Sequence, residues 1–198
     1  MERVRVFTQQ GMPVRQGVGI FARAFMQHLP LIPVEEEGRL SDPVLRENFI
    51  ERIFAYRRWR DLTQSRVTPR AIVSFHAAHK YQLLAHSRRH YQELGGLVAG
   101  GSRYPSRELS ERYGTLFMAA LKVRATARKN VNVLRDALGH FTGELNQPER
   151  TELLEVVEEY RQGLIPLVVP IMLVRHHVNR LDIRYLQDQV YLNPHPKN

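Results

Sequence analysis

The strongest constraint on the fold of this chain is a set of helix-start signals that recur after Ser41. In each signal, a side chain that accepts a hydrogen bond from the backbone stands just before a proline, or three residues before a glutamate. The signals are Asp42 with Pro43, Thr68 with Pro69, and Asn146 with Glu149. Because the runs after them carry apolar residues at helical spacing, we predict a mainly α-helical bundle over residues 41–198.

Within this bundle we expect one continuous helix over residues 69–97, ended by the paired glycines of GGLVAGGS, since glycine is poor in helices. Another helix is expected from about Ser106, with a break near residues 125–130. The stretch PLVVPIMLVRHHVNRL, residues 166–181, is apolar nearly all round. That pattern predicts a buried central helix.

Residues 1–40 have a different pattern, which predicts a short α/β fragment. Its expected elements are a strand over 3–8, a turn-rich loop over 9–19, a helix over 20–29 and a strand over 30–38. A piece of this size cannot bury a core of its own. The residue pattern therefore predicts a short α/β fragment over residues 1–40, followed by a helical domain over 41–198.

Charge is distributed unevenly along the chain. The whole sequence carries a formal net charge of +9, and its isoelectric point of about 10.2 points to an anionic partner. Residues 52–135 hold 17 Arg and Lys against 4 Asp and Glu, a net charge of +13. Residues 136–159 hold 1 basic and 7 acidic residues, a net charge of −6. The predicted contact with a polyanion therefore belongs to the middle of the chain.

Composition excludes several classes of site. The chain has no cysteine, which excludes disulfides, thiolate nucleophiles and cysteine-ligated metal clusters within it. The N-terminus lacks the apolar run of a signal peptide. The longest apolar stretch, over residues 164–174, is too short to span a bilayer of roughly 30 Å. We expect a cytoplasmic protein with no membrane partner.

Four of the nine histidines lie in FHAAHKYQLLAHSRRHYQELG, residues 75–95. At about 100° per residue on a helix, they fall within an arc of roughly 80°. The stripe suggests metal ligation, a packed seam inside the bundle, or a surface that touches phosphates or bases. A single ion cannot meet all four, because the stripe is about 21 Å long at roughly 1.5 Å per residue. The candidate contacts are His76, His79, Lys80, His86, Ser87 and His90.

Two further segments are candidates for RNA contact. YRRWR places Arg57, Arg58 and Arg60 beside two aromatic residues, a combination that binds phosphates and stacks on bases. The alternative is that the aromatic rings face the core. LKVRATARKNVN, residues 121–132, is the densest basic run and predicts phosphate contacts, the alternative being a solvated basic face. Its candidates are Lys122, Arg124, Arg128, Lys129, Asn130 and Asn132.

Five motifs also carry a family resemblance: FIERIFAYRRWR, FHAAHKYQLLAHSRRHYQELG, ATARKNVNVLRDALGHF, YRQGLIPLVVPIMLVRHH and YLQDQVYLNPHP. Over about residues 48–196 the chain resembles the YbgA-like family, domain of unknown function 1722. In that family the domain occurs alone or fused behind a desulfidase domain. The fused form resembles RudS-type enzymes, which remove sulfur from 4-thiouridine in tRNA.

The resemblance extends to residues 1–40, which look like the tail of the desulfidase (DUF523/TudS-like) domain. It implies that the cluster cysteines and the catalytic residues lie upstream of this stretch, so that the missing half would carry the iron–sulfur cluster. For this chain alone we therefore expect no cofactor, no metal and no catalytic residue.

The function expected from charge and resemblance is a module that binds tRNA or another structured RNA and presents thiolated tRNA to a desulfidase-like catalytic domain. Two alternatives stay open at this point. One is an enzyme with a metal-assisted site on the histidine stripe, and the other is a protein–protein interaction module for a separate catalytic half. The sequence does not indicate an oligomeric state.

Overall fold

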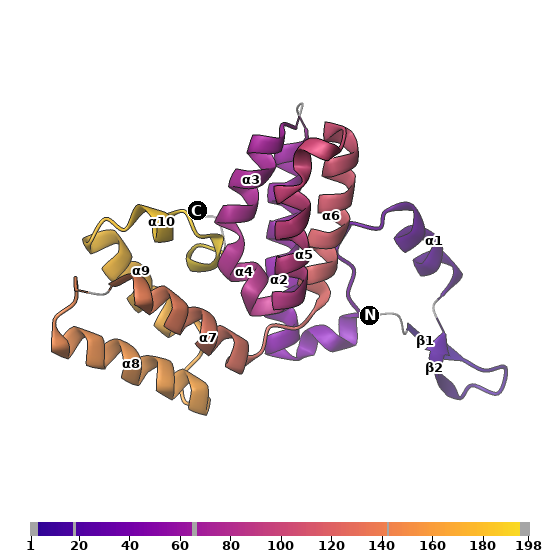
Figure 1. Ribbon diagram of the computed structural model, residues 1–198. Helices are drawn as coiled ribbons and strands as arrows, with labels where there is room; N and C mark the ends of the chain where they lie inside the picture. The colour runs from indigo at the N-terminus through magenta and orange to yellow at the C-terminus, as the bar shows by residue number, and fades with distance from the viewer. Residues whose placement is uncertain (1–3, 18, 65–66, 142, 195–198) are drawn as a thin grey trace.

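The computed structural model describes residues 4–17, 19–64, 67–141 and 143–194 (Figure 1). It is mainly α-helical, which confirms the predicted fold class. The helices are α1 (Ile20–His28), α2 (Pro43–Thr63), α3 (Pro69–Ala78), α4 (Lys80–His86), α5 (Arg88–Ala99), α6 (Ser106–Lys122), α7 (Ala127–Leu138), α8 (Gln147–Gln162), α9 (Val168–Arg180) and α10 (Arg184–Gln187). Short 3-10 helices are η1 (Glu37–Ser41), η2 (Gly101–Arg103), η3 (Gly139–Phe141) and η4 (Val190–Leu192).

The predicted helix starts are confirmed by their caps. The Asp42 carboxylate accepts hydrogen bonds from the backbone N–H groups of Val44 and Leu45, at 2.8 and 3.3 Å. Thr68 caps α3 in the same way, through the N–H of Ala71. Asn146 and Glu149 form a reciprocal capping box at the start of α8. These bonds satisfy backbone donors that the first turn of a helix leaves unpaired.

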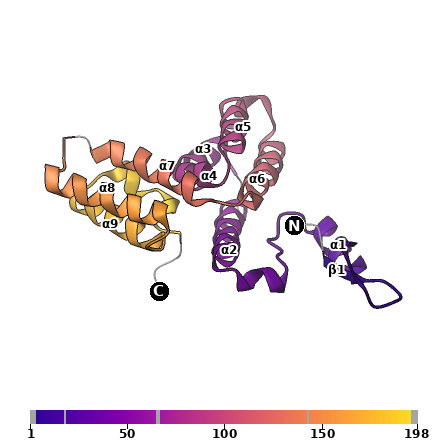
Figure 2. The same cartoon turned by 90° about the horizontal axis from the view of Figure 1, so that it is seen from below.

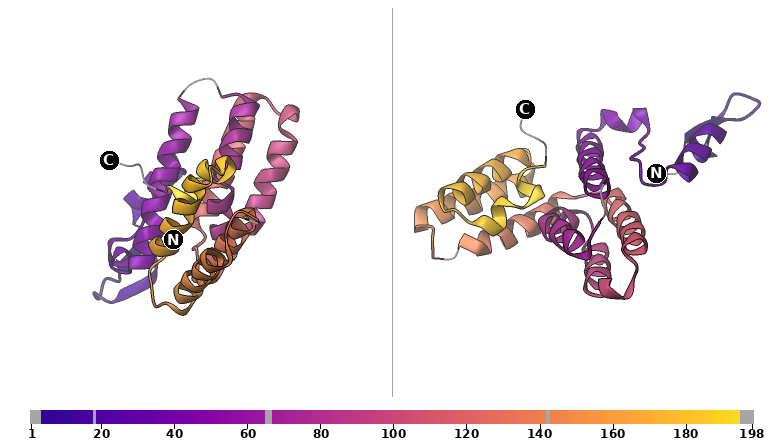
Figure 3. Two further views of the ribbon diagram at one scale, coloured as in Figure 1. Left: turned by 90° about the vertical axis from the view of Figure 1, so that its left-hand side faces the viewer. Right: turned by 90° about the horizontal axis from the view of Figure 1, so that it is seen from above.

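Two hydrophobic cores organise the helices into two lobes (Figures 1 and 3). The first lobe consists of α2, α3, α5 and α6, and its core includes Trp59, Tyr113 and Phe117. The second lobe consists of α7, α8, α9 and the segment after them, and its core includes Leu134 and Val174. Helix α4 lies between the lobes and contributes side chains to both cores.

The predicted single helix over 69–97 is wrong, because the chain is interrupted twice there. His79 ends α3 and Ser87 separates α4 from α5, with Ser87 in an extended conformation. The Ser87 hydroxyl caps α5, and this turn allows α5 to pack against both α3 and α6. Helix α5 then continues through the paired glycines to Ala99, since packing of Leu94 in the core overrides their low helix propensity.

The N-terminal unit, comprising β1 (Val4–Phe7), β2 (Pro13–Gly17) and α1, differs from the predicted fragment. The two strands form an antiparallel hairpin, so part of the predicted loop over 9–19 is a strand. The predicted strand over 30–38 is absent from these described residues, which form a turn, an irregular stretch over 33–36 and the start of η1. Glu35 lies there with its carboxylate bound to Arg39 and Arg52, at 2.8 and 3.5 Å. The division of the chain at residue 40 stays a prediction.

Figure 2 shows the N-terminal unit projecting from the two lobes. Across the described residues of α1, none is buried. Helix α9 also departs from expectation: Val174 and Val178 are fully buried, but Val168 and Met172 are more than half exposed. It therefore covers the second core with one face and leaves the other open. Among the helices in the described ranges, none is long and apolar enough to cross a membrane.

The first core is centred on Trp59, whose ring stacks on Tyr113 with centroids 5.2 Å apart. Its indole lies against α6 at Gly114, where an added Cβ would be 2.6 Å from Trp59 Nε1. Only a residue without a side chain permits this approach. Gly114 therefore sets the spacing between α2 and α6.

We expect Gly114→Ala to lower the free energy of unfolding by about 2 kcal/mol, because overpacking a full core costs roughly 1–3 kcal/mol. Urea denaturation would measure this change. The matched control is Gly96→Ala in α5, where an added Cβ meets nothing within 4 Å. That change should leave stability equal or raise it by up to about 1 kcal/mol. Equal effects of the two substitutions would contradict the packing argument.

Candidate nucleic-acid interface

The densest basic run of the sequence lies where α4 and α5 meet α6 and α7. Lys129, in the first turn of α7, donates hydrogen bonds from Nζ to the carbonyl oxygens of His86 (2.6 Å) and Arg124 (2.9 Å). These bonds hold the α4–α5 turn against the α6–α7 connection. We call this region, residues 86–88 and 122–129, the junction.

His86 fixes the inner side of the junction. Its side chain is fully buried, with Nδ1 2.6 Å from the carbonyl oxygen of Val123 and Nε2 3.1 Å from a carboxylate oxygen of Glu51. Both partners are acceptors, so both contacts are hydrogen bonds when each ring nitrogen carries a proton. The Asn48 side chain accepts from the backbone N–H of Ala125 at 2.9 Å. Helix α2 thus positions the connection between α6 and α7.

The outer side of the junction presents four cationic side chains, those of Arg88, Lys122, Arg124 and Arg128. All four are exposed, and within the described part of the chain no ion pair involves any of them. Lys129 is half-buried behind them, and desolvation by burial lowers its pKa.

Two helix N-termini face the same region. Ser87 caps α5 and Thr126 caps α7, through bonds from the N–H groups of His90 and Lys129. Neither helix has an acidic residue in its first turn, and both carry basic side chains there instead. Cations at the positive end of a helix dipole are unfavourable, and an anion there would offset the repulsion. The arrangement suits a phosphate-bearing ligand.

The exposed cations continue along one side of α7. Arg128, Asn132 and Arg135 are all exposed and lie four and three residues apart, so they share a helical face. Asn130, by contrast, is only 5% exposed, and its amide bonds the hydroxyls of Tyr160 and Tyr191 at 3.1 Å each. This finding corrects the prediction that Asn130 contacts a ligand.

The histidine stripe is not one surface. His79 and His86 are 2% and 0% exposed, which corrects the prediction that they contact a ligand directly. The His79 ring stacks on Phe75, with centroids 3.9 Å apart, and its Nδ1 lies 2.7 Å from the Phe75 carbonyl oxygen. Desolvation by burial lowers the pKa of His79 to about 3. Of the three alternatives for the histidine stripe, the packed seam inside the bundle therefore applies to His79 and His86.

The other members of the stripe are partly buried and have separate partners. His76 stacks on Tyr91 and contacts the Tyr113 hydroxyl at 3.2 Å. His90 Nδ1 lies 2.7 Å from the Ser87 hydroxyl. Lys80 places Nζ over the rings of two tyrosines, at 5.1 and 5.5 Å. Within the described ranges no three or more His, Cys, Asp or Glu are grouped so that they could hold a metal ion.

The YRRWR segment is largely engaged within the protein. Trp59 is 2% exposed, so the core alternative holds for this ring. Arg57 bonds Asp61 at 2.8 Å, and Arg58 donates to the carbonyl oxygens of residues 193 and 194 at 3.2 and 2.8 Å. Arg60 is exposed and donates to the Tyr56 hydroxyl at 3.3 Å. This segment supports the fold more than it extends the junction.

Sequence reasoning did not include several residues that shape the junction. In the continuous helix that the sequence predicts, Arg88 would face away from the histidine stripe, so nothing in the pattern indicates it as a contact. The inner supports Asn48 and Glu51 lie far from the basic run in sequence. Thr126 carries a usable signal, since it precedes a basic amphipathic run and can cap it.

Comparison with known proteins gives one family and one curated relative. A family model described as "Protein of unknown function (DUF1722)" matches residues 80–196, from the start of α4 to beyond η4. The "Uncharacterized protein YbgA" of Escherichia coli (strain K12) is 29% identical over 147 residues, which are 74% of this chain and 87% of that protein. No solved structure matches the chain. The matched region includes the whole junction.

The buried His79 generates a pH prediction. An unfolded histidine titrates near 6.5, whereas His79 titrates at about 3 in the folded chain, so between these values only the unfolded state takes up the proton. Stability should therefore fall as the pH drops below about 6.5, and His79 should account for about 2 kcal/mol between pH 7 and pH 5.

Chemical denaturation at pH 7 and pH 5 would measure the loss of unfolding free energy in the parent chain and in His79→Gln. The loss in His79→Gln should be smaller than in the parent chain by about 2 kcal/mol. The exposed His140 provides the control, and His140→Gln should keep the parent pH dependence. An unchanged pH dependence in His79→Gln would show that His79 does not stay neutral in the folded protein.

Proposed function

This chain belongs to the DUF1722 family of proteins of unknown function, and on that premise we propose that it is an RNA-binding module whose ligand is tRNA or another structured RNA. The observation that carries the proposal is the junction, where Arg88, Lys122, Arg124 and Arg128 are exposed around two helix N-termini. Phosphate groups are the ligands that such a surface suits best.

Rigidity of the junction supports this function. Lys129 and His86 bind backbone carbonyl groups on the α4–α5 turn and the α6–α7 connection, which keeps the surrounding cations in a defined pattern. Phosphate contacts made by a rigid pattern position an RNA by its shape and backbone spacing. Asn132, exposed on the same side of α7 as Arg128, would add a hydrogen-bonding group for a base edge or a 2′-hydroxyl.

In this proposal the chain is an accessory module that is not catalytic by itself. It would present thiolated tRNA to a desulfidase-like catalytic domain, a role that rests on the resemblance to fused family members. The iron–sulfur cluster implied for that domain does not fit this chain, because the chain has no cysteine to supply thiolate ligands. The chemistry would therefore belong to the partner.

Binding to bulk tRNA should weaken steeply with salt, since each phosphate contact releases counterions. Arg124→Ala and Arg128→Ala should each weaken binding and reduce the slope of log K against log salt by about 1. Fluorescence anisotropy over a salt series would measure both quantities.

Arg107→Ala is the matched control for these variants. Arg107 is also exposed, but it lies near the start of α6 at the opposite end from Lys122 and pairs with Glu111 at 2.9 Å. It should bind tRNA like the parent chain. Salt-insensitive binding, or equal losses in all three variants, would rule out the junction as the RNA-binding surface.

A second candidate function is a protein–protein interaction module, and the N-terminal unit favours it. Ile20 and Phe21 are 91% and 82% exposed, although they begin an amphipathic helix. An isolated two-stranded hairpin is marginally stable in water. A partner domain that covers this face would stabilise both α1 and the hairpin.

A separately produced desulfidase-like domain should form a complex with the chain in size-exclusion chromatography and raise its melting temperature. Phe21→Asp should abolish both effects, because it places a charge in the apolar contact. Met172→Asp, at an exposed apolar position on α9, serves as the control and should keep them. If the two proteins elute separately with unchanged melting, this second function is wrong.

A further inference from the structure

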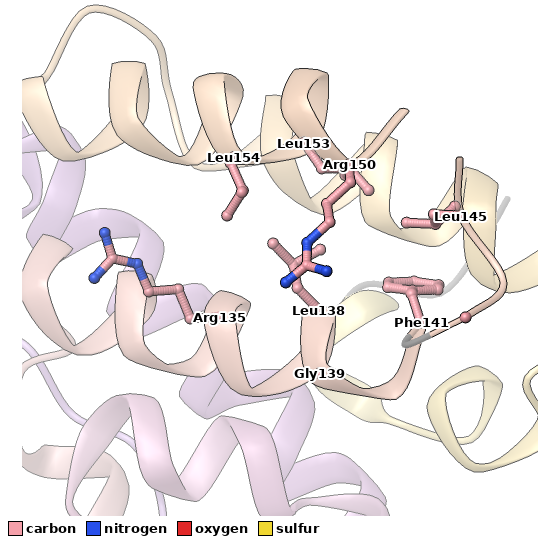
Figure 4. Close-up of a pocket in the computed structure, with 9 residues that line it drawn as sticks. Arg135, Leu138, Gly139, Phe141, Leu145, Arg150, Leu153 and Leu154 are labelled. Carbon is pink, nitrogen blue, oxygen red and sulfur yellow. The ribbon is translucent and has the colours of Figure 1, made fainter. Parts of the chain in front are cut away.

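A small cavity lies between α7 and α8, in the second lobe (Figure 4). Its volume is about 190 Å³, and its wall continues through η3 and the connection to α8. The apolar part of the lining includes Leu138, Phe141, Leu153 and Leu154. Phe141 and Leu153 belong to the second core, whereas Leu154 is 44% exposed at the rim. The floor of the cavity is therefore formed by core side chains, and its mouth is open to solvent.

Two arginines provide the polar part of the lining. Figure 4 shows Arg150 extending from α8 toward α7, and Arg135 extending from α7 away from Arg150, so that the two guanidinium groups are separated. Both residues are exposed, and neither forms an ion pair within the described part of the chain. Guanidinium groups bind carboxylates and phosphates through paired hydrogen bonds.

The acidic residue that could neutralise Arg135 is already engaged. Glu158 accepts hydrogen bonds from Arg161 at 2.5 and 2.7 Å, and from the Gln162 amide at 2.9 Å. A carboxylate held by another arginine leaves the Arg135 guanidinium with hydrogen-bonding capacity for a ligand. The two cations at the cavity are thus available to an anion.

We propose that this cavity binds a small amphipathic anion, in which one ring or a short chain fills the apolar floor while a carboxylate or phosphate meets Arg150, with Arg135 as a second cation at the rim. An apolar lining with a few polar groups is typical of small-molecule sites. Drug-sized ligands occupy roughly 300–1,000 Å³, so a cavity of about 190 Å³ selects a smaller molecule.

The surroundings separate this site from the proposed RNA surface. Leu154 also borders a shallow acidic surface formed by α8, which includes Glu155 and Glu159. A polyanion laid across α8 would be repelled by these carboxylates, whereas a molecule with one anionic group can enter beside the arginines. The inference therefore does not depend on RNA binding at the junction.

The test is an NMR titration of the ¹⁵N-labelled chain with two compounds of this chemistry, sodium octanoate and phenyl phosphate. We expect saturable shifts of the Gly139, Gly143 and Leu154 amides with at least one of them, and its identity would distinguish an acyl carboxylate from an aryl phosphate. Octanol, which has the apolar chain without the charge, should bind about tenfold or more weakly than octanoate if octanoate is the ligand.

Three variants locate the site. Arg150→Ala should weaken binding about tenfold and Arg135→Ala by less, and Leu154→Trp should abolish binding by filling the cavity while leaving the charge unchanged. Arg107→Ala should bind like the parent chain. Absent saturable shifts with both compounds, or binding unaffected by Leu154→Trp and Arg150→Ala, would overturn the proposal. Binding of tRNA should be unchanged in Arg150→Ala, which keeps the two proposals separable.

Discussion

The contact on which the rest of the structure depends is the buried imidazole of His86. A polar ring enclosed by protein is costly unless its nitrogens are paired, and both are paired here, with Val123 and Glu51. These partners belong to the α6–α7 connection and to α2, so one side chain on α4 ties together three parts of the fold. The Lys129 ammonium adds a second tie through the His86 carbonyl oxygen. The exposed cations of the junction are arranged around this internal network.

Much of the helical architecture could be predicted because its signals are local. A cap such as Asp42 or Thr68 acts on the three residues after it, so its effect can be recognised without knowledge of the fold. The interruptions at His79 and Ser87 could not be predicted in the same way. They depend on α5 turning back to pack on α3 and α6, a tertiary contact that also overrides the paired glycines.

The candidate site was predictable in its charge and not in its geometry. The basic run over 121–132 identified Lys122, Arg124 and Arg128, which are exposed at the junction. Periodicity alone could not tell which face of that run is buried, and Asn130 is enclosed by two tyrosines. The same limit applies to the histidines, whose burial follows from how α4 is placed between two lobes. Arg88 joins the cations because the turn at Ser87 redirects it.

Helix α4 has a consequence for how the molecule unfolds. Its seven residues place Leu83 in the first core and Tyr81 and Ala85 in the second. Release of this helix would remove buried apolar surface from both cores at once. The two lobes are therefore thermodynamically coupled through a short element that belongs to both cores.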